Sequence, residues 1–201
     1  MNLLTSMGLL PLIGAGLIAL LPVTTVKLIK QSALLVSVLV AALGITMTIG
    51  FDRGVTGFQY VERYSWIPSL GISYQLGVDG ISLILILLSV LLVPIVILAG
   101  WNESEGGRFS VKTFYILILV LETMMIGVFA ATDLFLFYVF FEAMLVPVYF
   151  LIGGYGSGAR QAAAVKFLLY SLFGGLLMLA SIIGIFVISG NQIGRTFDIT
   201  A

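Results

Sequence analysis

The sequence predicts an all-α fold, a polytopic bundle of six transmembrane helices. Of the 201 residues, 61% are hydrophobic and 9% are charged. The mean hydropathy is +1.22, which lies outside the range of soluble domains. Six apolar stretches are long enough to cross a hydrocarbon core of about 30 Å at about 1.5 Å per helical residue. They are residues 3–21, 31–50, 80–100, 111–130, 134–152 and 162–189.

The first stretch is as hydrophobic as a secretory signal peptide, but its charges are in the wrong place. A signal peptide has basic residues before its apolar run. Here the first basic residues, Lys27 and Lys30, come after the run. We therefore expect residues 3–21 to form the first transmembrane helix.

The long connection at residues 51–79 predicts a short β-hairpin on the outer membrane face. Apolar residues alternate along its second part, at Ile72, Tyr74 and Leu76. Pro68 and Gly71 are turn-forming residues that precede this alternation. This pattern is typical of two short strands joined by a tight turn.

Two aspartates directly precede apolar stretches and are predicted helix N-caps. Asp79 opens the third helix and Asp133 opens the fifth, and aspartate is a preferred residue at this position. Prolines inside these two helices, Pro94 and Pro147, remove a backbone N–H and predict kinks.

Small residues recur at a four-residue spacing in the sixth stretch. Ser171 is followed by Gly175, and Gly184 follows Ala180. This spacing places each pair on one helix face and permits close packing against a neighbouring helix.

The basic residues predict the orientation of the helices in the membrane. Loops one, three and five hold five of them, which are Lys27, Lys30, Arg108, Lys112 and Arg160. The opposite side holds three, which are Arg53, Arg63 and Arg195. Because cytoplasmic loops carry the excess of Lys and Arg, we expect the N-terminus to lie outside.

The composition excludes several kinds of site. The chain has no Cys and no His, which removes the usual ligands of zinc, haem and iron–sulfur centres, so no metal site is expected. Nine Lys and Arg balance nine Asp and Glu, so no basic surface for nucleic acid is expected. The glycine-rich residues 153–160 do not match a dinucleotide-binding motif and predict a flexible loop.

Glu142 is the strongest candidate for a functional residue. It lies about 14 Å along the fifth helix from its start, close to the membrane midplane. Ionisable groups at this depth usually face a partner or a water-filled cavity. Tyr138 and Tyr149 share its helix face, and Pro147 leaves a nearby carbonyl without its helical donor. The alternative is a structural carboxyl hydrogen-bonded to a neighbouring helix.

Glu122 and Lys166 are two further ionisable residues within apolar helices. Glu122 lies near the middle of the fourth helix, with Tyr115 on the same face. Lys166 lies about two turns into the sixth helix, with Tyr170 one turn further. Glu122 could serve a proton path or a packing hydrogen bond, and Lys166 could extend its charge to the membrane surface. An ion pair that opens and closes would change the proton affinity of both members.

Several motifs together resemble a known family. They are A-T-D-L-F-L-F-Y-V-F-F-E-A-M-L-V-P-V-Y-F-L-I-G-G-Y-G, A-A-A-V-K-F-L-L-Y-S, L-G-V-D-G-I-S-L and I-G-V-F-A-A-T-D. As a set they closely resemble the antiporter-like subunits of respiratory complex I, specifically chain M of bacterial NADH-quinone oxidoreductase. The resemblance covers essentially the whole chain.

The resemblance implies a proton-translocating membrane-arm subunit in a bacterial inner membrane. Such a subunit couples NADH oxidation and quinone reduction to proton pumping without redox catalysis of its own. Glu142 matches the family's midplane glutamate, Lys166 a lysine of the sixth helix, and Glu122 an acid found in many bacterial relatives. NADH, FMN, iron–sulfur clusters and quinone are expected in partner subunits of the membrane and peripheral arms.

The family fold contains inverted repeats, of which this chain would hold only a part. Residues 1–110 are expected to form the N-terminal helices with the hairpin, and residues 111–201 the start of the first proton-channel repeat. We therefore expect the chain to be the N-terminal part of a longer subunit. Two alternatives are a subunit of a multi-subunit cation/proton antiporter and a membrane scaffold that does not pump.

Overall fold

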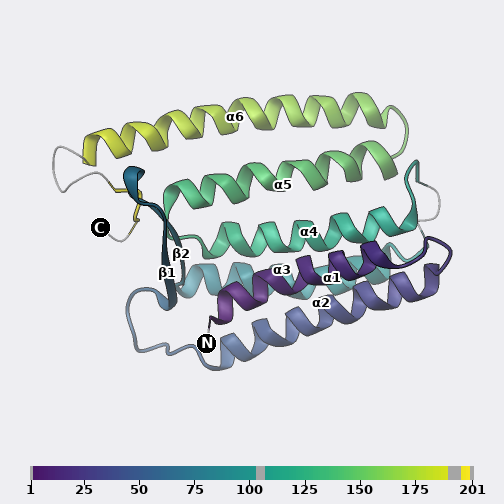
Figure 1. The fold of residues 1–201 in the computed structure, drawn as a ribbon, viewed down its shortest axis with the longest axis horizontal. Helices are drawn as coiled ribbons and strands as arrows, with labels where there is room; N and C mark the ends of the chain where they lie inside the picture. Colours follow the sequence, from purple (N-terminus) through teal and green to yellow (C-terminus); the bar gives the residue numbers. More distant parts are fainter. Residues whose placement is uncertain (1, 103–106, 190–195, 200–201) are drawn as a thin grey trace.

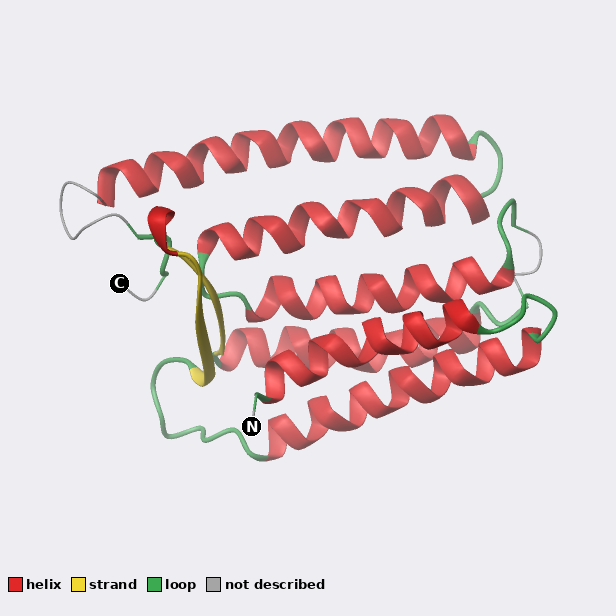
Figure 2. Cartoon of the chain, in the orientation of Figure 1, coloured by secondary structure: helices red, strands yellow, loops and turns green. Residues whose placement is uncertain are grey.

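The structure, a computed structural model, describes residues 2–102, 107–189 and 196–199. This part of the chain forms six helices and one two-stranded sheet (Figures 1 and 2). The helices are α1 (Leu3–Leu20), α2 (Val26–Ile49), α3 (Gly80–Ala99), α4 (Val111–Ala130), α5 (Leu134–Tyr155) and α6 (Arg160–Ser189). Each is long and apolar enough to cross a membrane, which confirms the six predicted spans. Pro94 and Pro147 lie within α3 and α5, which continue past them.

Helix α4 is the central element of the bundle. It packs against α1, α2, α3 and α5, whereas α6 packs along α5 at the edge (Figure 1). Apolar side chains from α1 to α4 form most of the core. Helices α5 and α6 leave many of their apolar side chains exposed. The fourth helix therefore separates a well-covered interior from an open α5–α6 layer.

The predicted hairpin is confirmed and crosses one end of the bundle (Figure 2). Strand β1 (Gln59–Ile67) pairs antiparallel with β2 (Ile72–Val78), and the short 3₁₀ helix η1 (Pro68–Leu70) joins the two strands. Gly71 follows with a φ of 68°, a left-handed conformation that favours glycine. The turn residues predicted from the sequence thus form the turn.

The side-chain alternation in β2 is confirmed in part. Ile72 and Leu76 are buried as expected. Gln75 is also buried. Its backbone carbonyl accepts a hydrogen bond from the Thr132 N–H at 2.9 Å, and its side-chain amide NH₂ donates to Asp198 at 3.2 Å. Polar contacts with the ends of the helices therefore override the alternation.

A carboxylate of the hairpin caps the N-terminus of α1. Glu62 is buried and accepts hydrogen bonds from the N–H groups of Leu4 at 2.8 Å and Thr5 at 3.1 Å, and from the Thr5 hydroxyl. The preceding residue, Asn2, makes no side-chain cap. A negative charge at this point satisfies free backbone donors and complements the helix dipole. The hairpin thereby completes a helix that lies 58 residues earlier in the chain.

Both predicted aspartate caps are confirmed. Asp79 forms a capping box with Ser82 at the start of α3, and these hydrogen bonds hold the pKa of Asp79 below its ordinary range. Asp133 accepts from Phe135 and Leu136 at 3.0 Å, and also from the N–H of Ser73 in β2 at 3.0 Å. Asp133 therefore caps α5 and attaches it to the hairpin.

Basic side chains bind helix ends on the opposite side of the bundle. Lys112 donates to the carbonyls of Ala19 and Leu21 at the end of α1, the second at 2.9 Å. Lys30 is buried and donates to the Trp101 carbonyl. Cations stabilise helix C-termini in this way. Arg195, which entered the orientation argument, lies outside the described residues.

We expect Glu62→Gln to lower the free energy of unfolding of the complete protein by about 1–2 kcal/mol, because the neutral amide weakens charge-assisted bonds to the α1 N-terminus. Thermal unfolding in detergent measures the difference. Arg63→Gln is the neighbouring control. Its ion pair with Asp198 at 3.3 Å is solvent-exposed on the arginine side, so the loss there is below about 1 kcal/mol. Equal losses for the two variants would contradict the role of Glu62.

Candidate functional site

Two carboxyl groups lie near the middle of α4 and α5 at similar depths. The backbone of Gly127 in α4 lies against the ring of Phe140 in α5, which sets the register of these antiparallel helices. In that register Glu142 and Glu122 are about three residues, or about 4.5 Å, apart along the helix axis. The two side chains nevertheless face different parts of the bundle.

Glu122 lies in the interior formed by α1 to α4. Its side chain is 0% exposed, and neither carboxylate oxygen has a hydrogen-bond partner within the described part of the chain. Tyr115, two turns earlier on the same face, is equally buried, and its hydroxyl also lacks a partner there. A carboxylate so far from water costs several kcal/mol in its charged form without a partner. Within the described part of the chain, Glu122 therefore has no group that would stabilise its charged form.

A neighbouring hydroxyl ties this part of α4 to α1. Thr123 donates to the carbonyl of Gly8 at 2.9 Å. The bond joins the two helices next to Glu122 in the sequence. It holds α4 against α1, and it makes no hydrogen bond to the carboxyl group of Glu122.

Glu142 lies at the interface of α5 and α6, over Gly175. A Cβ atom built at Gly175 would lie 1.6 Å from Oε1 of Glu142. Only glycine therefore leaves room for the carboxyl group at this position. Oε1 is buried and has no hydrogen-bond partner among residues 2–102, 107–189 and 196–199.

The small-residue spacing in the sixth helix has a different outcome at each position. Gly175 is buried against α5 as predicted, and it also makes room for Glu142, which the sequence argument missed. Gly184 has no atom within 4 Å of a built Cβ, and Ala180 is exposed. The sequence pattern indicated a packing face, but the charged side chain on the partner helix could not be inferred from α6 alone.

Lys166 does not meet Glu142 in the structure. It precedes Gly175 by nine residues, which places it about 14 Å away along α6 and on the opposite helix face. Lys166 and Tyr170 are both exposed. Any partner of the Lys166 ammonium group must therefore come from outside the described residues.

The site consists of two carboxyl groups, one in the interior of α1 to α4 and one at the α5–α6 interface. Among the described residues, no group of three or more His, Cys, Asp or Glu side chains gathers as a metal site would require. The arrangement consists of isolated acids within apolar helices. Such residues usually mark ion or proton pathways.

Comparison with known proteins gives the family. Residues 9–128 match the model of NADH-ubiquinone oxidoreductase chain 4, amino terminus. The chain belongs to this family. Residues 131–200 match a second model, described as NADH:quinone oxidoreductase/Mrp antiporter transmembrane region. Glu122 thus falls within the segment that matches the chain 4 model, and Glu142 within the segment that matches the second model.

A curated relative and two solved structures are similar over nearly the whole chain. NADH-quinone oxidoreductase subunit M of Mycobacterium tuberculosis is 44% identical over 97% of this chain and 40% of its own length. A chain of respiratory complex I from Thermus thermophilus is 30% identical, with a TM-score of 0.81, covering 98% of this chain and 38% of that one. A chain of the Mrp complex from Dietzia sp. is 19% identical, with a TM-score of 0.72 over 98% of this chain and 20% of that one, and shares the fold. The chain thus spans about two fifths of the curated relative's length.

We expect Gly175→Ala to destabilise the complete protein by about 1–3 kcal/mol, because the added methyl group must displace the carboxyl group of Glu142 or the helix. Gly174→Ala is the matched control, since a Cβ there meets nothing within 4 Å. Thermal unfolding of the two variants provides the comparison. If they unfold at the same temperature, Glu142 does not depend on Gly175 for its place.

Proposed function

We propose that this chain is part of the proton-translocating membrane-arm subunit of an NADH-quinone oxidoreductase, respiratory complex I. The observation that carries the proposal is a pair of carboxyl groups at similar depth in adjacent membrane helices of a chain 4 family member, neither of which has a hydrogen-bond partner among the residues that the structure describes. A carboxyl group without a fixed partner can take up and release a proton when the charge near it changes. The subunit is then a pump driven by redox chemistry elsewhere in the complex.

Each of the three candidate residues has a distinct proposed role. Glu142, at the open α5–α6 interface, exchanges protons with groups beyond α6. Glu122 is the inner acid of the path, reached through the interior of α1 to α4. Lys166 acts with a partner outside the described residues, because it faces away from the bundle.

The cofactors belong to partner subunits in this proposal. The chain has neither Cys nor His, so it lacks the usual ligands of iron–sulfur clusters. NADH, FMN and quinone would be bound by partner subunits. We place the N-terminus and the hairpin on the outer face of a bacterial inner membrane, following the distribution of Lys and Arg. We also propose that residues 111–201 begin the first proton-channel repeat, after an N-terminal unit at residues 1–110.

A cation/proton antiporter subunit is the second candidate. It is favoured by the description of the model that matches residues 131–200 and by the fold shared with the Mrp complex chain. The 44% identity to a subunit M favours the redox complex. Sodium/proton exchange in vesicles without NADH would separate these two functions.

Glu142→Gln in the complete subunit is expected to reduce NADH-driven proton uptake into inverted membrane vesicles about tenfold or more, because the amide cannot exchange a proton. NADH oxidation by an artificial acceptor, which tests assembly, should remain near wild type. If proton uptake and quinone-linked turnover both stay near wild type, Glu142 is structural and the scaffold alternative gains support.

Lys166→Met is expected to leave the free energy of unfolding within about 0.5 kcal/mol of wild type, because the side chain is exposed and away from the core. Proton uptake should fall severalfold in the same preparation. A large loss of stability with normal proton uptake would instead assign Lys166 to packing.

A further inference from the structure

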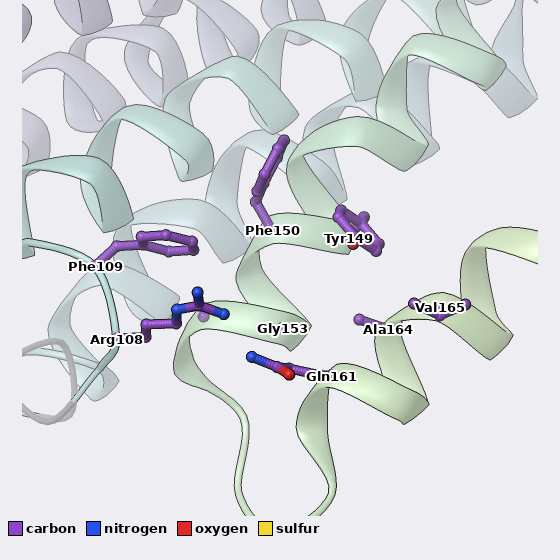
Figure 3. Close-up of a pocket in the computed structure, with 9 residues that line it drawn as sticks. Arg108, Phe109, Tyr149, Phe150, Gly153, Gln161, Ala164 and Val165 are labelled. Carbon is purple, nitrogen blue, oxygen red and sulfur yellow. The ribbon is translucent and has the colours of Figure 1, made fainter.

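An open cavity of about 360 Å³ lies at the end of the bundle where α5 and α6 meet the segment before α4. Residues of all three segments line it, namely Arg108, Phe109, Tyr149, Phe150, Gln161 and Val165, with Gly153, Gly154 and Ala164 at its floor. Figure 3 shows the side chains of Arg108 and Gln161 extending into the space beside Gly153, with aromatic rings beyond them. None of the proposed proton-path residues lines this cavity.

Hydrogen bonds fix the segment that carries Arg108. Its own N–H donates to the carbonyl of Gly154 at 2.8 Å. The hydroxyl of Tyr155 donates to the carbonyl of Ser110 at 2.7 Å. The guanidinium group lies over the ring of Phe109 at 5.8 Å and makes no hydrogen bond or ion pair within the described part of the chain. A positive charge is thus held in place and left available.

The charge around the cavity is positive. A neighbouring hollow, which shares Gln161, is lined by Arg160 and the first residues of α6. No carboxylate is among the described residues that line either space. Glu103 and Glu105 precede Arg108 in the sequence and lie outside the described residues. Arg160 donates to the carbonyl of Gly156 at 3.3 Å, whereas the guanidinium group of Arg108 and the amide of Gln161 both line the cavity. A guanidinium group beside an amide forms a setting suited to a phosphate group.

An apolar strip leads from the cavity toward the middle of the bundle. On α6 the exposed residues Val165, Leu169, Leu172 and Leu176 follow at one-turn intervals, and on α5 they are joined by Phe150 and Val146. Helical geometry places them on the same side of the α5–α6 contact as the cavity. From Val165 to Leu176 the strip is about 16 Å long, close to half of the roughly 30 Å hydrocarbon core.

We propose that this cavity binds the phosphate headgroup of an anionic phospholipid, with its acyl chains along the α5–α6 strip. The cationic opening lies at the helix ends, where headgroups are found, and the apolar strip continues into the hydrocarbon region. Basic pockets between membrane helices bind anionic lipids in this manner. A free phosphate would account for the charge but not for the strip. The lipid lies along the α5–α6 contact, and its binding does not depend on the proton-path proposal.

Photolabelling of the complete membrane complex tests this site. The delipidated complex is incubated with photoactivatable phosphatidylglycerol or phosphatidylcholine, and labelled peptides of α5 and α6 are quantified by mass spectrometry. We expect phosphatidylglycerol to label these peptides more strongly, and Arg108→Gln to reduce that labelling about fivefold. Arg108→Lys should retain it. Lys27→Gln is the matched control, an exposed cation at the same end of the bundle but outside the cavity.

Three results would overturn the proposal. Equal labelling by both lipids with no effect of Arg108→Gln would mean ordinary boundary lipid. Complete competition by excess inorganic phosphate would mean a site for a free anion. Cross-links from the strip to another protein segment, with no lipid label, would mean that the strip is a helix interface. Because proton uptake is not the readout, failure here is distinguishable from failure of Glu142→Gln.

Discussion

The ends of membrane helices carry backbone N–H and C=O groups that must find hydrogen-bond partners. In this fold the hairpin provides partners for several of these groups. Glu62 bonds the first turn of α1, Asp133 bonds both the first turn of α5 and the backbone of β2, and Asp79 follows β2 directly as the cap of α3. The Tyr60 hydroxyl donates to the carbonyl of Met47 near the end of α2. One short sheet thus contacts the ends of four helices, α1, α2, α3 and α5.

The helices of this bundle carry carboxyl groups within their apolar spans. Helix α4 holds Glu122 in a fully buried position, and α5 holds Glu142 over a glycine of its neighbour. The two acids lie on different sides of α4, one in a closed interior and one at an open interface. The central helix is therefore both the main packing element of the bundle and the boundary between the surroundings of the two carboxyl groups.

The sequence was sufficient to predict the elements that depend on residues close together in the chain. Hydropathy located the six helices, and the side chains of Asp79 and Asp133 identified their caps because an N-cap bonds residues two or three positions away. Contacts between distant segments could not be predicted from the same signals. The cap that Glu62 forms on α1, the burial of Gln75 by Asp198, and the space that Gly175 leaves for Glu142 all depend on register between elements. Lys166 was grouped with Glu142 because both are ionisable residues in apolar helices, but helix periodicity places Lys166 on the face of α6 opposite the one that Glu142 contacts.

The contact between Glu62 and Leu4 also has a consequence for biogenesis. A ribosome completes α1 and α2 before it has synthesised the hairpin, so α1 enters the membrane without its cap. Residues 51–79 must then reach the same side of the membrane as the N-terminus before the carboxylate can bond to Leu4 and Thr5. The first helix to be made is thus capped only after the second helix and the hairpin have been made.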